Sequence, residues 1–336
     1  MLRAALVLCL ATRMAASVQV PKLKLNDGRE IPAIALGTYL GFDANGIIRS
    51  ENHQLRDIVT RAIDLGFRHF DTSPVYHTEG EIGEGVAGKM SAGVVQRGDV
   101  FVTTKLWNTH HRREQVPVAL RESLKNLDMN YVDLYLMHWP IGVNEDYSNN
   151  DVDFMETWRG LEDVQRLGLA KSIGVSNFNQ SQLQRLLNES SIKPAVLQIE
   201  VHTQMVQAPL VSFAQSQGLV VMGYSPFGSL VERFGAPKPS SQPLLEELAA
   251  KYQKTPAQVV LRWLVDRNII PMPKTVNSKR LQENINIFDF QLEKEDIEKI
   301  NGLDTGLRFT LPSFWQDHLY YPFEKVENPI PSPFGK

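Results

Sequence analysis

The chain has 336 residues, and its 35 Lys and Arg against 38 Asp and Glu give a formal net charge of −3. With 43% hydrophobic and 22% charged residues it has the composition of a folded globular protein, which excludes collagen-like, low-complexity and intrinsically disordered chains. The near-neutral charge argues against a nucleic-acid binder, which needs a basic face. The single cysteine, Cys9, excludes an intrachain disulfide and a zinc site built from cysteines.

The N-terminus has the pattern of a secretory signal peptide. Arg3 precedes an apolar run from Ala4 to Ala11, and small residues follow at 15–17. We therefore expect residues 1–17 to be a leader and the protein to be secreted; a cytoplasmic enzyme with a frayed extension is the alternative. The apolar run is too short to span a bilayer, so no membrane partner is expected. No change in composition interrupts residues 20–336, which predicts a single domain.

After a hairpin pattern with a turn at Asn26-Asp27-Gly28, short apolar stretches alternate with helical patterns. Apolar residues at helical spacing predict a helix over Glu114–Asp128, and a helix end at Gly168. Asn179 and Pro256 are typical of helix starts. The apolar stretches read as eight buried parallel strands at Ala33–Thr38, His69–Ser73, Val100–Leu106, Val132–Trp139, Ser172–Ser176, Val196–Val201, Leu219–Tyr224 and Ile269–Lys274.

Eight strand-then-helix units in a chain of this size predict a TIM-type (β/α)₈ barrel, an α/β fold. A doubly wound sheet is the alternative, which the count of eight disfavours. The pieces beyond the barrel are the opening hairpin, two extra helices at Pro243–Tyr252 and Leu292–Asn301, and a tail at Leu303–Lys336 that is rich in proline and aromatic residues.

One motif is misleading. Residues Gly83 to Gly88 spell the G-x-G-x-x-G pattern of dinucleotide-binding folds, but the preceding strand ends near Ser73 and the next acidic residue, Asp99, precedes its strand. We interpret these glycines as part of a helix and its exit.

In a (β/α)₈ barrel the active site lies at the carboxyl ends of the strands. Polar or aromatic residues stand at seven of these ends, and they are Asp71 with Tyr76 in the loop beyond it, Lys105, His138, Ser176 with Asn177, Gln198, Tyr224 with Ser225, and Lys274 with Thr275. Each residue alone has an ordinary structural explanation, but core packing does not require that they occur together.

Four of these residues suit the reduction of a carbonyl group. A lysine ammonium held by a carboxylate should lower the pKa of a nearby tyrosine, which makes the phenol a proton donor near neutral pH. A neutral histidine can donate a hydrogen bond to the substrate oxygen. The sequence has no cluster of metal ligands, so the hydride must come from an organic cofactor.

The chain resembles the aldo-keto reductase family, and within it the aldose-reductase-like branch. The resemblance covers about residues 20–323. The matching motifs fall in the family's order, and they are Gly66–Tyr76, Thr103–Trp107, Leu136–Pro140, Ile173–Phe178, Gln198–Glu200, Tyr224–Pro226 and Pro273–Asn284.

The resemblance implies that Tyr76 is the proton donor, that Lys105 and Asp71 tune it, and that His138 orients the substrate. It implies NADPH as the cofactor. The implied cofactor contacts include Thr38, and the implied nicotinamide contacts are Ser176, Asn177, Gln198 and Tyr224. A stretch that includes Ser225, Phe227 and Ser229 would cover the pyrophosphate. The implied ligands of the 2′-phosphate are Lys274, Thr275, Asn277 and Arg280, and Glu283 and Asn284 would lie near the adenine. Lys274 and Arg280 beside a helix start at Asn277 also suit a phosphate on physical grounds.

The substrate pocket implied by the family pattern is apolar and aromatic, as aldehydes or bulky ketones require. It comprises Tyr39, Val75, Trp107, His138 and Trp139, together with the tail aromatics Phe309, Phe314, Trp315 and Tyr320. Position 39 is often tryptophan in the family and here is tyrosine, which changes the pocket's shape. The short stretch after Pro140 predicts an open wall. The chain is most similar to insect members that reduce 3-dehydroecdysteroids.

Two other functions fit less well. A Schiff-base aldolase would use Lys105 as its nucleophile, but it leaves Gln198, Lys274 and Arg280 unexplained. A nucleotide-binding barrel that only regulates a partner need not keep all of Asp71, Tyr76, Lys105 and His138. We therefore predict an oxidoreductase with a small carbonyl substrate, no metal, and a monomeric state, as is common in the family.

Overall fold

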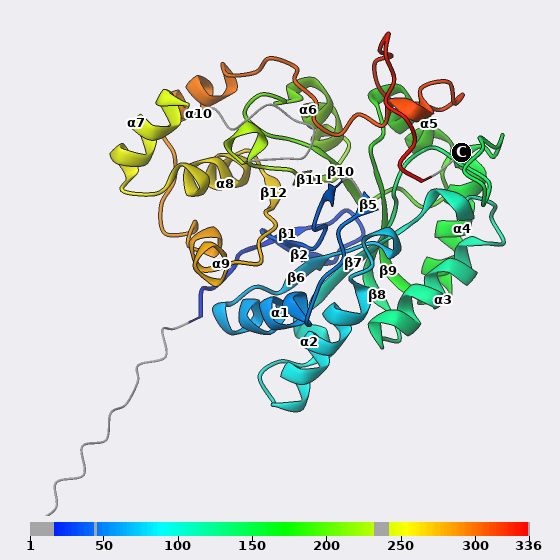
Figure 1. Ribbon diagram of the computed structural model, residues 1–336, viewed down its shortest axis with the longest axis horizontal. Coiled ribbons are helices and arrows are strands. Elements are labelled where there is room, and N and C mark those ends of the chain that lie inside the picture. The colour runs from blue at the N-terminus through cyan, green and yellow to red at the C-terminus, as the bar shows by residue number, and fades with distance from the viewer. Residues whose placement is uncertain (1–16, 44–45, 232–241, 335–336) are drawn as a thin grey trace, which may run out of the picture.

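The computed structural model describes residues 17–43, 46–231 and 242–334, with backbone alone at Phe42, Asp43 and Gly46. The predicted leader therefore lies outside the described residues, except for Ser17. Strands form a central ring and helices surround it (Figure 1).

The ring is the predicted (β/α)₈ barrel. Its strands are hydrogen-bonded in the order β12-β11-β10-β9-β8-β7-β6-β3, and every pair is parallel. A parallel bridge between Gly37 and Lys274 joins the two ends of the sheet. The eight strands are β3 (Leu36–Gly37), β6 (His69–Asp71), β7 (Phe101–Leu106), β8 (Val132–Met137), β9 (Ala170–Ser176), β10 (Val196–Glu200), β11 (Val220–Tyr224) and β12 (Ile269–Met272).

Helices follow the strands around the outside of the ring (Figure 1). They are α1 (Gln54–Leu65), α2 (Glu79–Ser91), α3 (Val116–Leu127), α4 (Phe154–Arg166), α5 (Gln180–Glu189), α6 (Ala208–Ser216), α7 (Pro243–Tyr252), α8 (Pro256–Asp266), α9 (Ser278–Ile285) and α10 (Lys294–Asn301). The predicted caps are confirmed, since the Asn179 side chain accepts the Gln182 N–H at the start of α5 and Pro256 opens α8.

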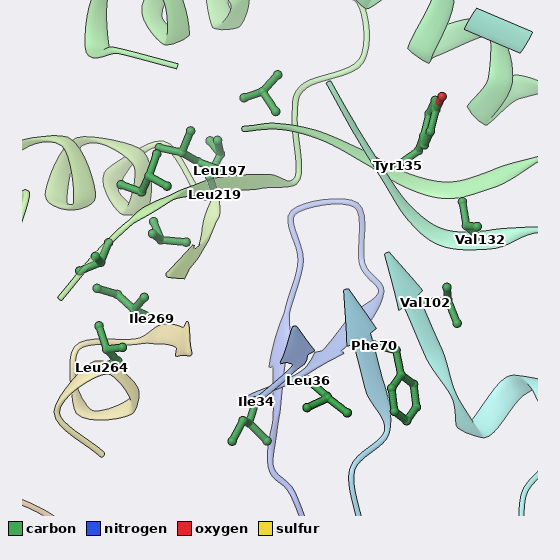
Figure 2. Close-up of a cluster of buried hydrophobic side chains, with 14 of the residues drawn as sticks. Ile34, Leu36, Phe70, Val102, Val132, Tyr135, Leu197, Leu219, Leu264 and Ile269 are labelled. Carbon is green, nitrogen blue, oxygen red and sulfur yellow. The ribbon is translucent and has the colours of Figure 1, made fainter. Parts of the chain in front are cut away.

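The strands are apolar on both faces because each face has its own core. Side chains that point outward, such as Phe70, Leu197 and Ile269, belong to one cluster with helix residues, and Figure 2 shows Ile269 of β12 beside Leu264 of α8. Side chains that point inward, such as Leu136 and Met222, fill the barrel itself.

The opening hairpin closes one end of the barrel. Its strands β1 (Lys22–Lys24) and β2 (Glu30–Pro32) pair antiparallel, as predicted. Ile31 is fully buried and packs with the inward-facing side chains of the barrel. A second short antiparallel pair joins β4 (Phe42–Asp43) to β5 (Gly46–Ile47). The polar groups of the strand ends lie at the other end of the barrel, where the strands reach their carboxyl ends.

The misleading glycine motif lies inside α2, and it is no dinucleotide loop. The helix continues to Ser91, so Gly88 is not at its exit as we expected. A Cβ on Gly83 would lie 2.3 Å from the Leu127 carbonyl oxygen, and one on Gly85 would lie 2.8 Å from the Val59 side chain. These glycines therefore let α2 pack closely on its neighbours.

Among the described residues, no helix is long and apolar enough to cross a membrane.

Candidate active site

The four predicted catalytic side chains meet at the carboxyl ends of three adjacent strands. Asp71 ends β6, Lys105 is in β7 and His138 directly follows β8, whereas Tyr76 ends the short 3₁₀ helix η1 (Pro74–Tyr76) that follows β6. The neighbouring order β6-β7-β8 in the sheet is what brings residues so distant in sequence together.

Lys105 and Asp71 form a buried ion pair. The Lys105 side chain is 0% exposed, and its Nζ lies 2.7 Å from Asp71 Oδ1 and 2.9 Å from the Thr72 carbonyl oxygen. Burial lowers the pKa of Lys105, while the Asp71 carboxylate opposes that change. Because the ammonium donates to two oxygens, it is held in place and is not presented as a free amine nucleophile.

Tyr76 and His138 are directly in contact. The Tyr76 hydroxyl lies 3.3 Å from His138 Nε2, and Lys105 Nζ lies 4.9 Å from the centre of the Tyr76 ring. Burial, reinforced by the Lys105 charge, holds the pKa of His138 well below its usual value. His138 is therefore neutral at physiological pH and can donate one hydrogen bond.

The expected lowering of the Tyr76 pKa is wrong for this structure. Burial raises the pKa of Tyr76 well above its usual value, and the Asp71 carboxylate raises it further. The Lys105 charge does not reverse this because Asp71 neutralises it at 2.7 Å. The phenol consequently keeps its proton at neutral pH.

Ser73 is a member of this site that our sequence reasoning missed. Its Oγ lies 3.2 Å from His138 Nδ1, the ring nitrogen opposite the one that faces Tyr76. Its position two residues after Asp71, within a motif already noted, was the available clue.

The predicted nicotinamide contacts lie on β9, β10 and β11, or directly after them, on the side of β8 away from β7 and β6. Asn177 Nδ2 donates to the His138 carbonyl oxygen at 2.9 Å, and the Tyr224 hydroxyl donates to Asn177 Oδ1 at 2.8 Å. Asn177 has a φ of 61°, which is unusual for a residue other than glycine and is common at functional sites. Ser176 is fully buried beside it and accepts from Asn177 Nδ2 at 3.1 Å.

Gln198 joins this group to the ion pair, since its Nε2 donates to Asp71 Oδ2 at 2.8 Å. Thr38 lies behind the ion pair, where its hydroxyl donates to the Asp71 carbonyl oxygen at 2.9 Å and is fully buried. The cofactor contact expected of Thr38 thus competes with a hydrogen bond already made.

The stretch expected to cover the pyrophosphate follows β11. Ser225 has a φ of 55°, and Gln242 Nε2 donates to Ser229 Oγ at 2.9 Å. Phe227 packs on the outer core. Residues 232–241, which continue this stretch, lie outside the described residues.

The predicted 2′-phosphate ligands gather at the N-terminus of α9. The Asn277 side chain caps this helix by accepting the N–H groups of Lys279 and Arg280. Lys274 and Arg280 are exposed, and neither forms an ion pair with a residue that the structure describes. Two cations beside a helix N-terminus suit a phosphate. Of the remaining predicted ligands, Thr275 and Asn284 are buried and Glu283 is half-buried.

The predicted substrate residues form an aromatic wall next to His138. The Trp107 ring centroid lies 5.1 Å from that of His138, and Trp139 lies 6.0 Å from Trp315 in the tail. On the other side, Tyr39 lies 5.0 Å from Tyr76. Val75 is half-buried within η1, and Phe314 packs against Trp315 at 4.7 Å.

Two of the tail aromatics are not in this wall. Tyr320 packs against Phe154 of α4 at 5.2 Å, and Phe309 lies 5.1 Å from His202. We expected an open wall after Pro140. This wall is instead covered, because Ile141 is buried in the same cluster as Trp315.

No group of three or more potential metal ligands occurs in the part of the chain that the structure describes. The side chains of the site are proton donors and hydrogen-bond donors around a neutral histidine, together with the amide and hydroxyl groups of Asn177, Gln198 and Ser176.

Comparison with known proteins identifies the family. A sequence profile of the aldo/keto reductase family matches residues 33–305. The chain belongs to the aldo/keto reductase family. It is an oxidoreductase, and its similarities lie in the aldose-reductase-like branch.

Three aldo-keto reductases illustrate the similarity. The silkworm (Bombyx mori) aldo-keto reductase AKR2E4 is 47% identical over 309 residues, 91% of this chain and 99% of that protein, and its crystal structure with NADP has a TM-score of 0.87. The silkworm aldo-keto reductase AKR2E5, crystallised with NADPH, is 44% identical over 95% of this chain and 99% of that one, with a TM-score of 0.90. Mouse estradiol 17 beta-dehydrogenase 5 is 37% identical over 90% of this chain and 97% of that protein.

Proposed function

We propose that this protein reduces aldehydes and ketones to alcohols with NADPH, with Tyr76 as the proton donor and His138 as the group that orients the carbonyl. The observation that carries the proposal is the contact of the Tyr76 hydroxyl with His138 Nε2 at 3.3 Å, beside the buried pair of Lys105 and Asp71. A carbonyl oxygen placed between the phenol and the imidazole would receive a hydrogen bond from each.

NADPH is the cofactor that the family indicates, and the residues present fit it. Gln198, Ser176 and Asn177 offer the amide and hydroxyl groups that a carboxamide pairs with. Lys274 and Arg280 offer two charges at the N-terminus of α9, which suits the 2′-phosphate that distinguishes NADPH from NADH.

NADPH supplies the hydride when it is bound. His138 fixes the carbonyl oxygen through its neutral Nε2–H. Tyr76 then transfers its proton to the same oxygen as the carbonyl becomes an alcohol, and the phenolate that remains lies next to the Lys105 ammonium. Asp71 holds that ammonium charged, and the aromatic wall keeps water away from the reacting oxygen.

We further propose that the substrates include bulky ring ketones, with 3-dehydroecdysteroids as candidates. The aromatic wall of Trp107, Trp139 and Trp315 supports an apolar substrate, and the mouse relative is named as an estradiol dehydrogenase. Loss of NADPH absorbance with ketosteroids, sugars and aliphatic aldehydes would rank these classes.

Secretion and a monomeric state are also proposals. The pattern at residues 1–17 supports a leader, and all the proposed catalytic groups come from one copy of the chain. N-terminal sequencing of protein recovered from the medium of secreting cells tests the first, and light scattering tests the second.

The experiment that tests the reaction is Tyr76→Phe. We expect turnover of a simple aldehyde to fall by a factor of about 10³, because the proton donor is gone, while NADPH still binds. The matched control is Tyr135→Phe, which removes a hydroxyl that has no partner among the described residues and lies on the helix-facing side of β8 (Figure 2). If Tyr76→Phe retains turnover or loses NADPH binding, the assignment is wrong.

A further inference from the structure

Phe334, near the end of the tail, fills a slot in the aromatic wall. Its ring lies 4.9 Å from Tyr147 at an interplanar angle of 8°, and 6.1 Å from Trp315 at 9°. Trp107 and Phe314 meet it at 61° and 70°, at 5.5 Å and 6.1 Å. The Phe334 ring is therefore nearly parallel to the rings of Tyr147 and Trp315, and two further rings meet it at steep angles.

This slot is next to the proposed reaction centre. Trp107, which contacts Phe334, also lies 5.1 Å from His138. Trp107 thus contacts both Phe334 and the imidazole that would hold the carbonyl oxygen. A substrate with a ring system attached to its carbonyl would extend towards the same slot.

The tail segment that carries Phe334 is weakly attached. Pro329, Pro331 and Pro333 have no N–H to donate, and residues 327–331 are exposed. The described backbone bonds of this stretch are one from Ile330 N to Ser313 Oγ at 3.0 Å and a local one from Phe334 N to Ser332 Oγ at 3.2 Å. The Phe334 ring is therefore its main anchor, and releasing it breaks few hydrogen bonds.

We propose that the slot lined by Tyr147 and Trp315 is a substrate subsite for a flat apolar ring joined to the carbonyl, and that Phe334 occupies it until such a substrate displaces it. This inference rests on the proposed carbonyl reduction. It makes Phe334 a specificity-determining residue, because only substrates large enough to reach the slot compete with the tail.

Competition by the tail has a defined kinetic consequence. The apparent affinity of a ring-bearing substrate equals its intrinsic affinity multiplied by the fraction of molecules whose slot is open. Aromatic contacts such as those of Phe334 favour the closed form. A short aliphatic aldehyde does not reach the slot, so its affinity is independent of the tail.

The test is Phe334→Ala, assayed with naphthaldehyde as the ring-bearing probe and propanal as the small one. We expect the KM for naphthaldehyde to fall about tenfold and the KM for propanal to stay within about twofold. The matched control is Phe290→Ala, which removes a ring that packs against Tyr252 outside the site, and it should change neither KM.

A second measurement does not depend on turnover. With 4-fluorophenylalanine at position 334, the fluorine resonance should be shifted by the neighbouring rings in the free protein. Naphthylmethanol, the reduced product, should move it towards the value of an exposed ring, whereas propanol should not.

The inference is overturned if the KM for naphthaldehyde is unchanged or higher in Phe334→Ala. It is also overturned if naphthylmethanol does not shift the fluorine resonance. In the first case Phe334 would be a fixed wall that substrates touch. If wild-type protein with NADPH reduces neither aldehyde, the proposed function fails instead, and the fluorine resonance still decides whether the slot accepts a ring.

Discussion

The hydroxyl of Ser73 lies 3.2 Å from Nδ1 of His138, and the direction of this hydrogen bond is tied to which nitrogen of the ring carries the proton. The pKa of His138 is held well below its usual value by burial, so the ring is neutral and has one N–H. If Ser73 donates to Nδ1, the proton is on Nε2, where it faces Tyr76 and the substrate oxygen.

We expect Ser73→Ala to lower kcat for carbonyl reduction about tenfold, because the ring can then take the unproductive tautomer or rotate. NADPH affinity should not change. Steady-state kinetics on one aldehyde, with NADPH binding followed by fluorescence, measures both. Thr103→Ala is the matched control, since the Thr103 hydroxyl lies 2.8 Å from Nε2 of the buried His69, below the site. If the two variants lose the same activity, Ser73 has only a structural role.

The pH dependence of reduction follows from the directions of two pKa shifts. Burial raises the pKa of Tyr76, so the donor keeps its proton as the pH rises through neutrality. Burial lowers the pKa of His138, so the ring stays neutral as the pH falls. We therefore expect kcat for reduction with saturating NADPH to be flat from about pH 5.5 to about pH 8.5. If the pH profile of kcat has a titration midpoint inside this range, and this midpoint disappears in Tyr76→Phe or in a His138 variant, the assignment is contradicted.

Cofactor choice is predicted to depend on Lys274 and Arg280. Replacing both with alanine removes two charges from the phosphate site at the N-terminus of α9. The Kd for NADPH should increase about a hundredfold and that for NADH by less than about threefold, because only NADPH carries the 2′-phosphate. Lys279→Ala, which removes an exposed cation from the same helix, is the control. Equal losses for the two cofactors would rule out a 2′-phosphate contact.

The sequence predicts the barrel well because each of its signals is local. Short strands such as β8 (Val132–Met137) are mostly apolar and buried on both faces, and caps such as Asn179 mark where helices begin. The four catalytic candidates stand at strand ends, and the parallel order of β6, β7 and β8 then forces them together.

Other features depend on contacts that no local pattern encodes. Tyr320 turns away to Phe154, and Phe334 enters the aromatic wall, although both belong to the same aromatic-rich tail. The direction of the Tyr76 pKa shift depends on burial and on how far Asp71 neutralises Lys105, and sequence spacing measures neither.

Glu200 shows how the tail is attached to the barrel. Its carboxylate is buried at the end of β10, where it accepts the N–H groups of Phe309 and Thr310 at 2.8 Å each and contacts His202 Nε2 at 3.0 Å. Burial works to raise the pKa of Glu200, but these hydrogen bonds outweigh it and the pKa is lowered. Glu200 thus fixes the point from which the tail continues towards Trp315.

We expect Glu200→Gln to raise the KM for a ring-bearing aldehyde about tenfold and to leave the Kd for NADPH within about twofold, because the amide cannot accept all three hydrogen bonds and the aromatic wall loses its support. Glu162→Gln is the matched control. Glu162 is buried in α4 and accepts the N–H groups of Ser191 and Ile192 at 2.8 Å each, away from the site. Both variants should lose about 1.5–3 kcal/mol of unfolding free energy, but only Glu200→Gln should change KM. If the KM rises equally in Glu200→Gln and Glu162→Gln, the rise comes from the loss of stability, and Glu200 does not position the substrate wall.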